Sequence, residues 1–372
     1  MSEEEDFNRA LFSVPKDRQQ ALHWWWALIR TTMSQYRPNV LSCQTVPVME
    51  YTTLGTTGVE VSRLCLGTMG FGSSDWRDWV LDEEESHEII DRAIDLGINF
   101  FDSANMYSRG ESERILGDAL EGYRDQAVVS TKCYYEMDEN NPHSQGLSRK
   151  TIEQELDASL DRLGMDTVDL FFAHRWDEDT PIDVTLGALD DAVRRGKTRY
   201  LGASSMWTYQ FAESLRTSER EGYERFDVMQ NHYNLLYREE EREMLPYCNQ
   251  RDVAVMTYSP LARGNLAVPF DEYETTDRGA NDNWAHQYPY RDGGGETIIG
   301  RVEELAAEKD ATMAQISLAW LLSKDPVTTP IIGVDSITHL EQAVDALDIS
   351  LSESDMEWLE EPYEPLPVAG HS

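Results

Sequence analysis

The sequence contains four side chains that together could move a proton: Asp102, Tyr107, Lys132 and His174. A lysine ammonium within about 4–6 Å of a tyrosine favours the phenolate, which makes the phenol a better acid. An aspartate beside the lysine keeps the lysine charged and fixes its direction, and a histidine can orient a substrate oxygen. Such a set would serve as a general acid for a developing alkoxide.

Each of these residues also has a simpler interpretation. Asp102 could cap a turn, Tyr107 could be an ordinary loop aromatic, and Lys132 could be a solvated charge. His174 follows an apolar strand pattern, where a histidine is more often structural than catalytic. The catalytic interpretation therefore depends on a fold that brings the four together.

Reduction of a carbonyl also needs a hydride donor, which no side chain can be, and a nicotinamide cofactor is the usual one. Ser204, Ser205 and Gln230 could hydrogen-bond its carboxamide, and Tyr258 could stack on its ring. A glycine loop at 333–336 leads into a helical pattern, which is a common arrangement for binding phosphate.

Eight short β-rich runs alternate with helical patterns, which predicts parallel βα units. The runs are 64–68, 98–101, 127–131, 168–172, 199–203, 226–229, 253–257 and 327–332. Most are continuously apolar, as in strands buried on both faces. We expect an α/β fold, the (β/α)8 TIM barrel. A doubly wound open sheet is the rival, but no Gly-x-Gly-x-x-Gly motif follows the first strand.

Polar residues follow the carboxyl end of nearly every predicted strand, including Asp102, Lys132, His174 and Gln230. In a (β/α)8 barrel these ends meet around one mouth, which carries the active site. The predicted fold therefore brings the proton-transfer residues together.

The remaining segments complete the barrel. Residues 51–63 predict a hairpin before the first strand, which could cover the bottom of the barrel. The stretch 264–295, after strand 7, is rich in Gly, Pro and Asp and predicts a long surface loop. That loop is either a lid over the site or a solvated insertion. Helical patterns follow at 297–309, 312–323 and 338–347.

The net charge is −37, which makes nucleic acid or an anionic membrane an unlikely partner. No apolar run approaches the roughly 20 residues of a membrane span. Only six of the 32 basic residues are lysines. An acidic, lysine-poor surface is typical of a salt-rich cytoplasm, so we expect a halophilic source; an ordinary acidic protein is the alternative.

Residues 1–48 contain five acidic and five basic side chains, so all 37 negative charges lie in 49–372. Either Met49 is the true start and 1–48 are upstream sequence, or 1–48 form an appendage with Trp24, Trp25 and Trp26 as a contact patch. We expect 49–372 to form a single barrel domain, with 1–48 an extension of doubtful status.

The four cysteines show neither metal spacing nor a disulfide framework, and the eight histidines show no metal-binding spacing. We therefore expect no metal and a reducing, cytoplasmic location.

From Met49 to about residue 350 the chain resembles the aldo-keto reductases. The resemblance lies in Leu66-Gly-Thr-Met, Phe101-Asp-Ser-Ala-Asn-Met-Tyr, Glu111-Ser-Glu-Arg-Ile-Leu-Gly, Ser130-Thr-Lys, His174-Arg-Trp, Gly202-Ala-Ser-Ser, Gln230-Asn-His-Tyr-Asn and Tyr258-Ser-Pro-Leu-Ala-Arg-Gly. The branch that it resembles most contains aryl-alcohol dehydrogenase-like and channel β-subunit-like members.

The resemblance implies a catalytic tetrad of Asp102, Tyr107, Lys132 and His174. It also implies a nicotinamide nucleotide site, for which the expected residues are Gly67, Thr68, Met69, Ser204, Ser205, Gln230, Tyr258, Ser259, Leu261, Arg263, Gly264, Gly333, Asp335, Ser336 and His339. The segment from Ser259 to Gly264 would cover the pyrophosphate, and the segment from Gly333 to Ser336 would face the adenosine.

One departure from the family concerns the cofactor. Many relatives carry Arg or Lys two or three positions after the strand-8 glycine, where it grips the 2′-phosphate of NADP, whereas this chain has Asp335 and Ser336. His339 is the nearest cation in sequence. The family default is NADP(H), but the local chemistry leans toward NAD(H), so both stay open.

The expected activity is reversible NAD(P)H-dependent reduction of an aldehyde or ketone to an alcohol. The main alternative is a redox-sensing regulatory subunit that binds the nucleotide with slow or no turnover, and a lyase or isomerase on the same barrel is a further rival. Trp76, Trp79, Trp176 and Trp207 predict an aromatic-lined substrate pocket, unless they only pack loops. The physiological substrate and the oligomeric state stay open.

Overall fold

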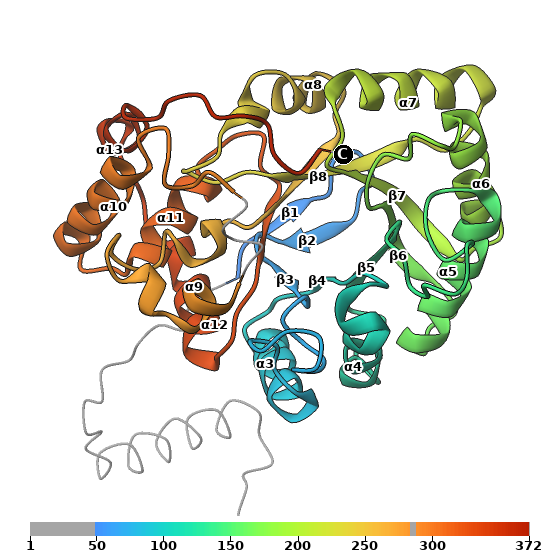
Figure 1. Ribbon diagram of the computed structural model, residues 1–372, viewed down its shortest axis with the longest axis horizontal. Helices are drawn as coiled ribbons and strands as arrows, with labels where there is room; N and C mark the ends of the chain where they lie inside the picture. Colours follow the sequence, from blue (N-terminus) through green and yellow to red (C-terminus); the bar gives the residue numbers. More distant parts are fainter. Residues whose placement is uncertain (1–48, 283–287, 372) are drawn as a thin grey trace, which may run out of the picture. The chain divides into compact units, whose positions relative to one another are not determined.

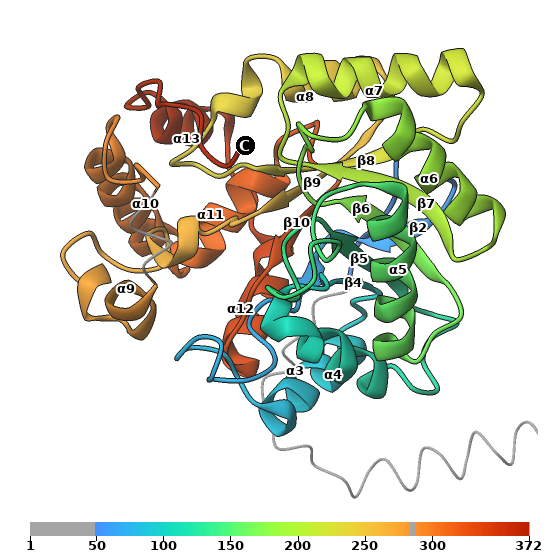
Figure 2. The ribbon, with the colours of Figure 1, turned by 45° about the vertical axis from the view of Figure 1, so that its right-hand side comes forward.

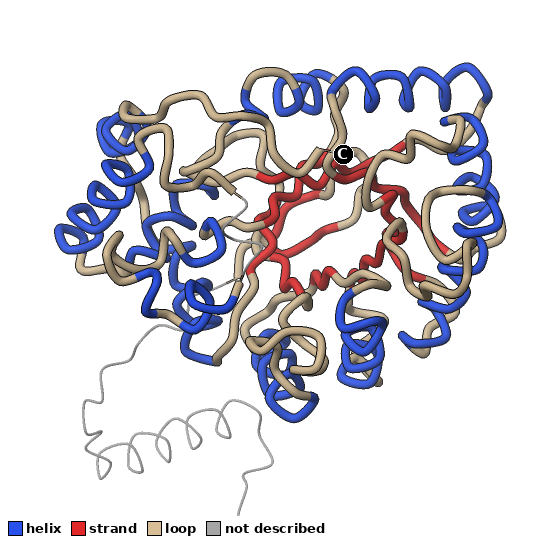
Figure 3. Tube along the Cα trace, viewed as in Figure 1, coloured by secondary structure: helices blue, strands red, loops and turns tan. Residues whose placement is uncertain are grey.

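The computed structural model describes residues 49–282 and 288–371, so both hypotheses about residues 1–48 lie outside the described residues. Eight parallel strands close into a barrel, which Figure 3 shows as a ring of strands with helices outside it. The strands are β3 (Cys65–Gly67), β4 (Phe100–Asp102), β5 (Val128–Cys133), β6 (Val168–Ala173), β7 (Thr198–Ser204), β8 (Phe226–His232), β9 (Ala254–Tyr258) and β10 (Thr329–Ile332). The predicted (β/α)8 barrel is confirmed, with strand bounds that differ by a few residues.

The inside of the barrel changes from apolar to polar along its axis. Alternate residues of a strand face the same side, so Val128 and Lys132 of β5 both point inward. Val128 joins a buried apolar cluster with Phe100 and Leu170 near the starts of their strands. Lys132 lies at the carboxyl end, where Asp102 of β4 is also buried. The apolar floor thus supports a polar layer at the mouth.

The predicted hairpin is present and covers the bottom of the barrel. Its strands, β1 (Tyr51–Thr53) and β2 (Glu60–Ser62), pair antiparallel. Leu54 and Val61 belong to the apolar cluster of the barrel interior, and Tyr200 of β7 donates a hydrogen bond to the carbonyl of Thr57 at 3.3 Å.

Helices surround the barrel in the order that the sequence predicts (Figure 1). They are α3 (Glu83–Asp95), α4 (Glu111–Ala119), α5 (Arg149–Leu163), α6 (Ile182–Arg194), α7 (Thr208–Glu221), α8 (Met244–Gln250), α10 (Gly295–Lys309), α11 (Met313–Leu322), α12 (Ile337–Asp345) and α13 (Glu353–Glu360). Asp82 and Glu85 form a capping box at the start of α3, and Gly164 ends α5 in the left-handed conformation.

The stretch after β9 is more ordered than the predicted loop. It contains the 3-10 turns Ala262–Gly264 and Tyr273–Thr275 and the short helix α9 (Asp277–Asn281). The hydroxyl of Thr276 caps α9 by accepting from the backbone N–H of Gly279 at 2.9 Å. The predicted long loop is present, and the structure adds to it the short helix α9, which a side-chain cap starts in a Gly-rich composition.

The chain beyond α13 returns to the barrel, and its end lies near β8 (Figures 1 and 2). The backbone N–H of Ala369 donates to the hydroxyl of Tyr237 at 2.9 Å. Among the described residues, no helix is long and apolar enough to cross a membrane.

Candidate active site

Lys132 connects Asp102 to Tyr107 at the mouth of the barrel. Its Nζ donates to Asp102 Oδ2 at 2.6 Å and to the backbone carbonyl of Ser103 at 2.6 Å. It lies 3.4 Å from the hydroxyl oxygen of Tyr107. All three donors of the ammonium are thereby directed, one of them at the phenol. The geometry is that of a cation held ready to stabilise a phenolate.

The Lys132–Asp102 pair lies out of contact with water. The side chains are 0 and 3% exposed, and Asp102 Oδ1 accepts from Ser130 Oγ at 2.6 Å and from Gln230 Nε2 at 3.1 Å. Burial is the largest influence on the pKa of Lys132 and lowers it. The opposing effects of Asp102 and Tyr107 are together larger and raise that pKa above its ordinary value. Lys132 therefore stays cationic at neutral pH.

His174 completes the group from the end of β6. Its ring lies 6.1 Å from the ring of Tyr107, centroid to centroid, and 5.0 Å from that of Tyr135. Burial, and then the charges of Arg175 and Lys132, hold the pKa of His174 well below its usual range. Its Nδ1 is buried without a hydrogen-bond partner among the described residues. A neutral imidazole is therefore available to a ligand.

The residues expected around the nicotinamide ring gather beside this group. The hydroxyls of Ser205 and Tyr258 lie 3.0 Å apart, and those of Ser204 and Ser205 lie 3.3 Å apart. His232 stacks on one face of the Tyr258 ring at 5.3 Å, so a second ring could stack only on the other face. Gln230 donates one N–H of its amide to Asp102, which leaves its second N–H and its carbonyl oxygen for a ligand.

Two arginines share one buried carboxylate in the loop after β9. Arg263 Nη1 and Arg278 Nε lie 3.3 and 3.2 Å from Asp282 Oδ2, and the Asp282 side chain is 1% exposed. The Nε of Arg263 is buried and has no hydrogen-bond partner among the described residues. Ser259 is held by Asn234, whose Nδ2 donates to its carbonyl at 2.9 Å. A net positive charge with an unused donor suits a pyrophosphate.

The loop after β10 carries its own ion pair. Asp335 Oδ1 and His339 Nδ1 are hydrogen-bonded. That bond is the main reason why the pKa of Asp335 is lowered and that of His339 is raised, and Arg278 adds to the effect on Asp335. Ser336 caps α12 by accepting from the N–H of His339, and a side chain at Gly333 would meet no atom within 4 Å. The carboxylate is thus partly balanced by cations.

Other expected cofactor residues have evident packing roles. A Cβ on Gly67 would lie 2.6 Å from Ile331 Cγ2, and the hydroxyls of Thr68 and Ser112 lie 2.7 Å apart. Met69 directly follows Thr68, and the described residues give no side-chain contact that would assign Met69 a role in binding. Leu261 directly precedes the 3-10 turn that carries Arg263, and Gly264 is the last residue of that turn.

Backbone strain is concentrated around the same mouth. Eight described residues other than glycine have positive φ, and six of them flank the site: Ser108, Arg109, Ser205, Ser259, Ala262 and Arg263. This conformation is costly for residues with a side chain and persists where surrounding structure enforces it. The strained positions thus cluster at the end of the barrel that carries Asp102, Lys132 and His174.

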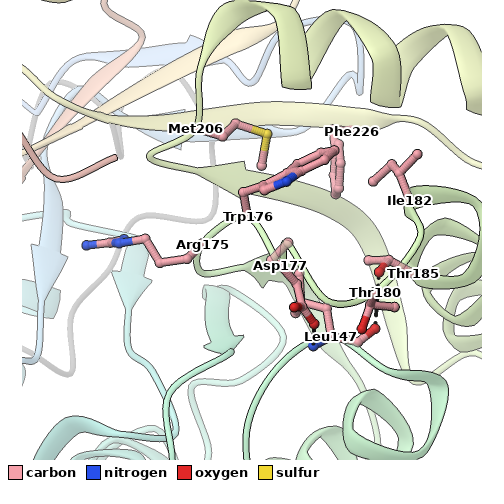
Figure 4. A pocket seen from close by; sticks show the side chains of 10 residues that line it. Leu147, Arg175, Trp176, Asp177, Thr180, Ile182, Thr185, Met206 and Phe226 are labelled. Atoms are coloured by element: carbon pink, nitrogen blue, oxygen red, sulfur yellow. Dashed lines mark hydrogen bonds between the residues drawn. The ribbon is translucent and has the colours of Figure 1, made fainter. Parts of the chain in front are cut away.

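The four tryptophans expected to line a pocket divide between different roles. The Trp76 ring lies 6.5 Å from that of Tyr107, and Trp79 lies under the guanidinium of Arg278 at 4.0 Å. Trp207 stacks on His371 at 4.9 Å. Trp176 lines a small hollow beside β6 with Met206 and Phe226 (Figure 4). Of the four, only Trp76 has a ring contact with a residue of the proton-transfer group.

Three residues of the mouth were not expected from the sequence: Tyr135, Arg175 and Arg278. Tyr135 and Arg175 come shortly after Lys132 and His174 in the chain, and that adjacency is a signal that could have found them. Arg278 lies in the unexpected helix α9 and had no such signal.

The model of the "Aldo/keto reductase family" matches residues 63–364. An aldo-keto reductase of Fusarium vanettenii is 40% identical over 348 residues, which are 87% of this chain and 94% of that protein.

Two further relatives have more specific names. A versiconal hemiacetal acetate reductase of Aspergillus parasiticus is 41% identical over 86% of this chain and 98% of its own length. A Schizosaccharomyces pombe protein named for aryl-alcohol dehydrogenase is 40% identical over 86% of this chain and 97% of its own length.

Proposed function

Because the chain belongs to the aldo/keto reductase family, we propose that it reduces an aldehyde or ketone to an alcohol with Tyr107 as proton donor. Membership makes the chain an oxidoreductase of carbonyl and alcohol groups that works with NAD(P). The observation that carries the proposal is the continuous contact from Asp102 through Lys132 to the phenol of Tyr107.

The proton path follows from that contact. As the carbonyl oxygen gains negative charge, the phenol of Tyr107 gives it a proton and becomes a phenolate. The Lys132 ammonium, 3.4 Å away, stabilises the phenolate, and Asp102 holds the ammonium in place. Because the pair is almost fully buried, its electrostatic effect on the phenol is stronger than it would be in water.

His174 would orient the carbonyl. As a neutral imidazole it can donate one hydrogen bond to the substrate oxygen without competing with Tyr107 for the proton. Trp76 and Tyr135 bring aromatic surface to the two sides of the Tyr107–His174 pair. Together with a relative named for aryl-alcohol dehydrogenase, this favours an aromatic aldehyde as substrate.

The donor set fits a nicotinamide dinucleotide, which supplies the hydride when bound. Tyr258 keeps one ring face away from His232, and Ser204 and Ser205 offer hydroxyls at the ring end. Arg263 offers a buried, unpartnered donor for the phosphates. Gly333 leaves open space toward the adenosine end.

Asp335 sets the preference between the two nucleotides. A carboxylate at this position repels a 2′-phosphate and can accept from a ribose 2′-hydroxyl. We predict that Asp335→Ser raises the affinity for NADPH relative to NADH by about tenfold, a typical effect of one close charge. Fluorescence titration of both nucleotides measures it. An unchanged ratio of the two affinities in the variant would contradict this role.

The activity is tested with purified full-length protein in about 2 M KCl, chosen to screen its charge. NADPH and NADH are each titrated, and oxidation is followed with a panel of aromatic aldehydes. Turnover supports the reductase. Tight binding without turnover across the panel would favour the redox-sensing regulatory subunit, and binding of neither nucleotide would refute both.

A further inference from the structure

We propose that Arg175 binds an anionic group, a carboxylate in the first instance, on the substrate whose carbonyl is reduced. The inference rests on the proposed function and deepens it, because it names the class of substrate: aldehydes or ketones that carry a carboxylate.

Arg175 lies at the mouth because it directly follows His174 at the end of β6. Its Nη1 donates to the carbonyl of His174 at 2.7 Å, and its guanidinium lies 5.5 Å from the ring centroid of Tyr135. Arg175 lines one edge of the hollow beside β6, and Figure 4 shows its guanidinium extending away from Trp176 and Met206, which also line it. The two adjacent side chains, Arg175 and Trp176, therefore point in different directions.

Arg175 has no acidic partner in the part of the chain that the structure describes, within 4.0 Å of its nitrogens. Other arginines with little exposure are paired: Arg238 with Glu241 and Glu360, and Arg263 with Asp282. A guanidinium has five N–H donors, and the only hydrogen bond of Arg175 within this part is to the backbone of its neighbour. Arg175 is only partly exposed, and a partly buried cation is stabilised by a counter-charge, so an external anion is the missing partner.

The surroundings of Arg175 place that anion close to the reacting carbonyl. Burial is the largest single influence on the pKa of Arg175 and lowers it. The phenols of Tyr258, Tyr135, Tyr288 and Tyr107 together have the larger, opposite effect, so the pKa is raised overall. The same guanidinium lowers the pKa of His174. The ring of Tyr135, 5.5 Å from the Arg175 guanidinium, is also 5.0 Å from the ring of His174, so Arg175 lies close to the proton-transfer group.

Local charge also explains why such a residue is needed. The chain carries a net charge of −37, which repels an anionic substrate. Two of the nearby arginines, Arg263 and Arg278, are shared with Asp282 in the loop expected over the pyrophosphate. Arg175 directly follows His174 in the chain and, unlike Arg263 and Arg278, has no acidic partner among the described residues.

The test compares a formylbenzoic acid with its methyl ester, which differ in one negative charge. For wild type we expect higher kcat/KM for the acid, chiefly through a lower KM. In Arg175→Gln we expect the acid-to-ester ratio of kcat/KM to fall at least about tenfold, with Arg175→Lys intermediate. An equal loss for acid and ester would mean a structural role and would overturn the proposal, as would a wild-type preference for the ester.

A binding experiment separates this inference from the proposed reductase function. Benzoate and benzamide are titrated into wild type and Arg175→Gln, followed by tryptophan fluorescence, with thermal melts as a check of folding. Preferential binding of benzoate that is lost in Arg175→Gln supports the anion site even if no aldehyde is turned over. If wild type binds benzamide as tightly as benzoate, the anion site is overturned. That comparison needs only wild type, so it holds even if Arg175→Gln does not fold.

Discussion

A buried lysine and aspartate form the chemical centre of the barrel mouth. Taking two charges out of water is costly, and the hydrogen bonds from Ser130, Gln230 and Lys132 to Asp102 offset that cost. The pair is therefore poor evidence for stability on its own. Its direction toward Tyr107, at 3.4 Å, is what gives it a function.

Asp102→Asn should destabilise the fold as well as lower activity. It leaves the Lys132 ammonium, 0% exposed, without a counter-charge, which costs about 3–5 kcal/mol. Urea unfolding of the variant measures the loss. The double variant Asp102→Asn/Lys132→Met, which removes the stranded charge, should recover part of it. A single variant as stable as wild type would show that the pair is not electrostatically coupled.

At the residue scale, the sequence predicted which side chains would meet but not all of their partners. Asp102, Lys132 and His174 were predictable neighbours because they end adjacent strands of a barrel. Gln230 was expected on a cofactor, and the structure adds a bond from its amide to Asp102 that was not expected. Such choices depend on side-chain angles and on packing between strands, which local sequence patterns do not encode.

Among the elements, the strands were predicted most closely and the segment after β9 least. Buried parallel strands are continuous apolar runs, a strong signal, whereas α9 has only five residues and includes Gly279. The helix α9 matters for the site because it places Arg278 beside Asp282 and close enough to Asp335 to lower the pKa of that carboxyl. A cation near Asp335 was sought in the sequence only at His339.

The segment that ends the described chain is held at the mouth by a pair of groups that are neutral at pH 7. His371 Nε2 lies 3.5 Å from Glu240 Oε1, with both side chains almost fully buried. Burial, and then Glu239, raise the pKa of Glu240 to about 8, while burial lowers that of His371 to about 4. Between these values the contact therefore joins two neutral groups and is not an ion pair.

Glu240→Gln should remove a pH dependence of stability. A carboxyl whose pKa is raised on folding makes its full contribution to stability at pH values below its pKa in the unfolded chain. That contribution is lost as the pH rises toward 8, the pKa in the folded protein. From pH 5 to 9, wild type should lose on the order of a few kcal/mol more than Glu240→Gln in urea unfolding. Glu243→Gln, which makes the same substitution at an exposed position, is the control. Parallel curves for wild type and Glu240→Gln would contradict the shift.

For the whole molecule, the dominant physical feature is charge. Residues 49–372 contain 64 acidic and 27 basic side chains, so like-charge repulsion opposes the compact state. Many of the ion pairs are at the surface, such as Arg220 with Glu221, and contribute little individually. The composition is what led us to expect a salt-rich cytoplasm.

Added salt should therefore stabilise the protein. Raising KCl from about 0.1 to 2 M shortens the Debye length from about 10 Å to less than 3 Å, which screens the repulsion more than the short ion pairs. We expect the urea midpoint to rise over this range, and sorbitol of equal osmolality to raise it less. A midpoint that is constant or falls with KCl would remove the physical basis for a halophilic source.

The central claim is that Tyr107 protonates a carbonyl that receives hydride from a nicotinamide. The most direct measurement follows deuterium from the reduced, C4-labelled nucleotide into the alcohol formed from an aromatic aldehyde, by mass spectrometry, in wild type and Tyr107→Phe. We predict one deuterium per alcohol in wild type, and in Tyr107→Phe nucleotide binding close to that of wild type with the rate of labelling reduced about 10²–10⁴-fold. Unlabelled alcohol, or equal rates in the two proteins, would contradict the account.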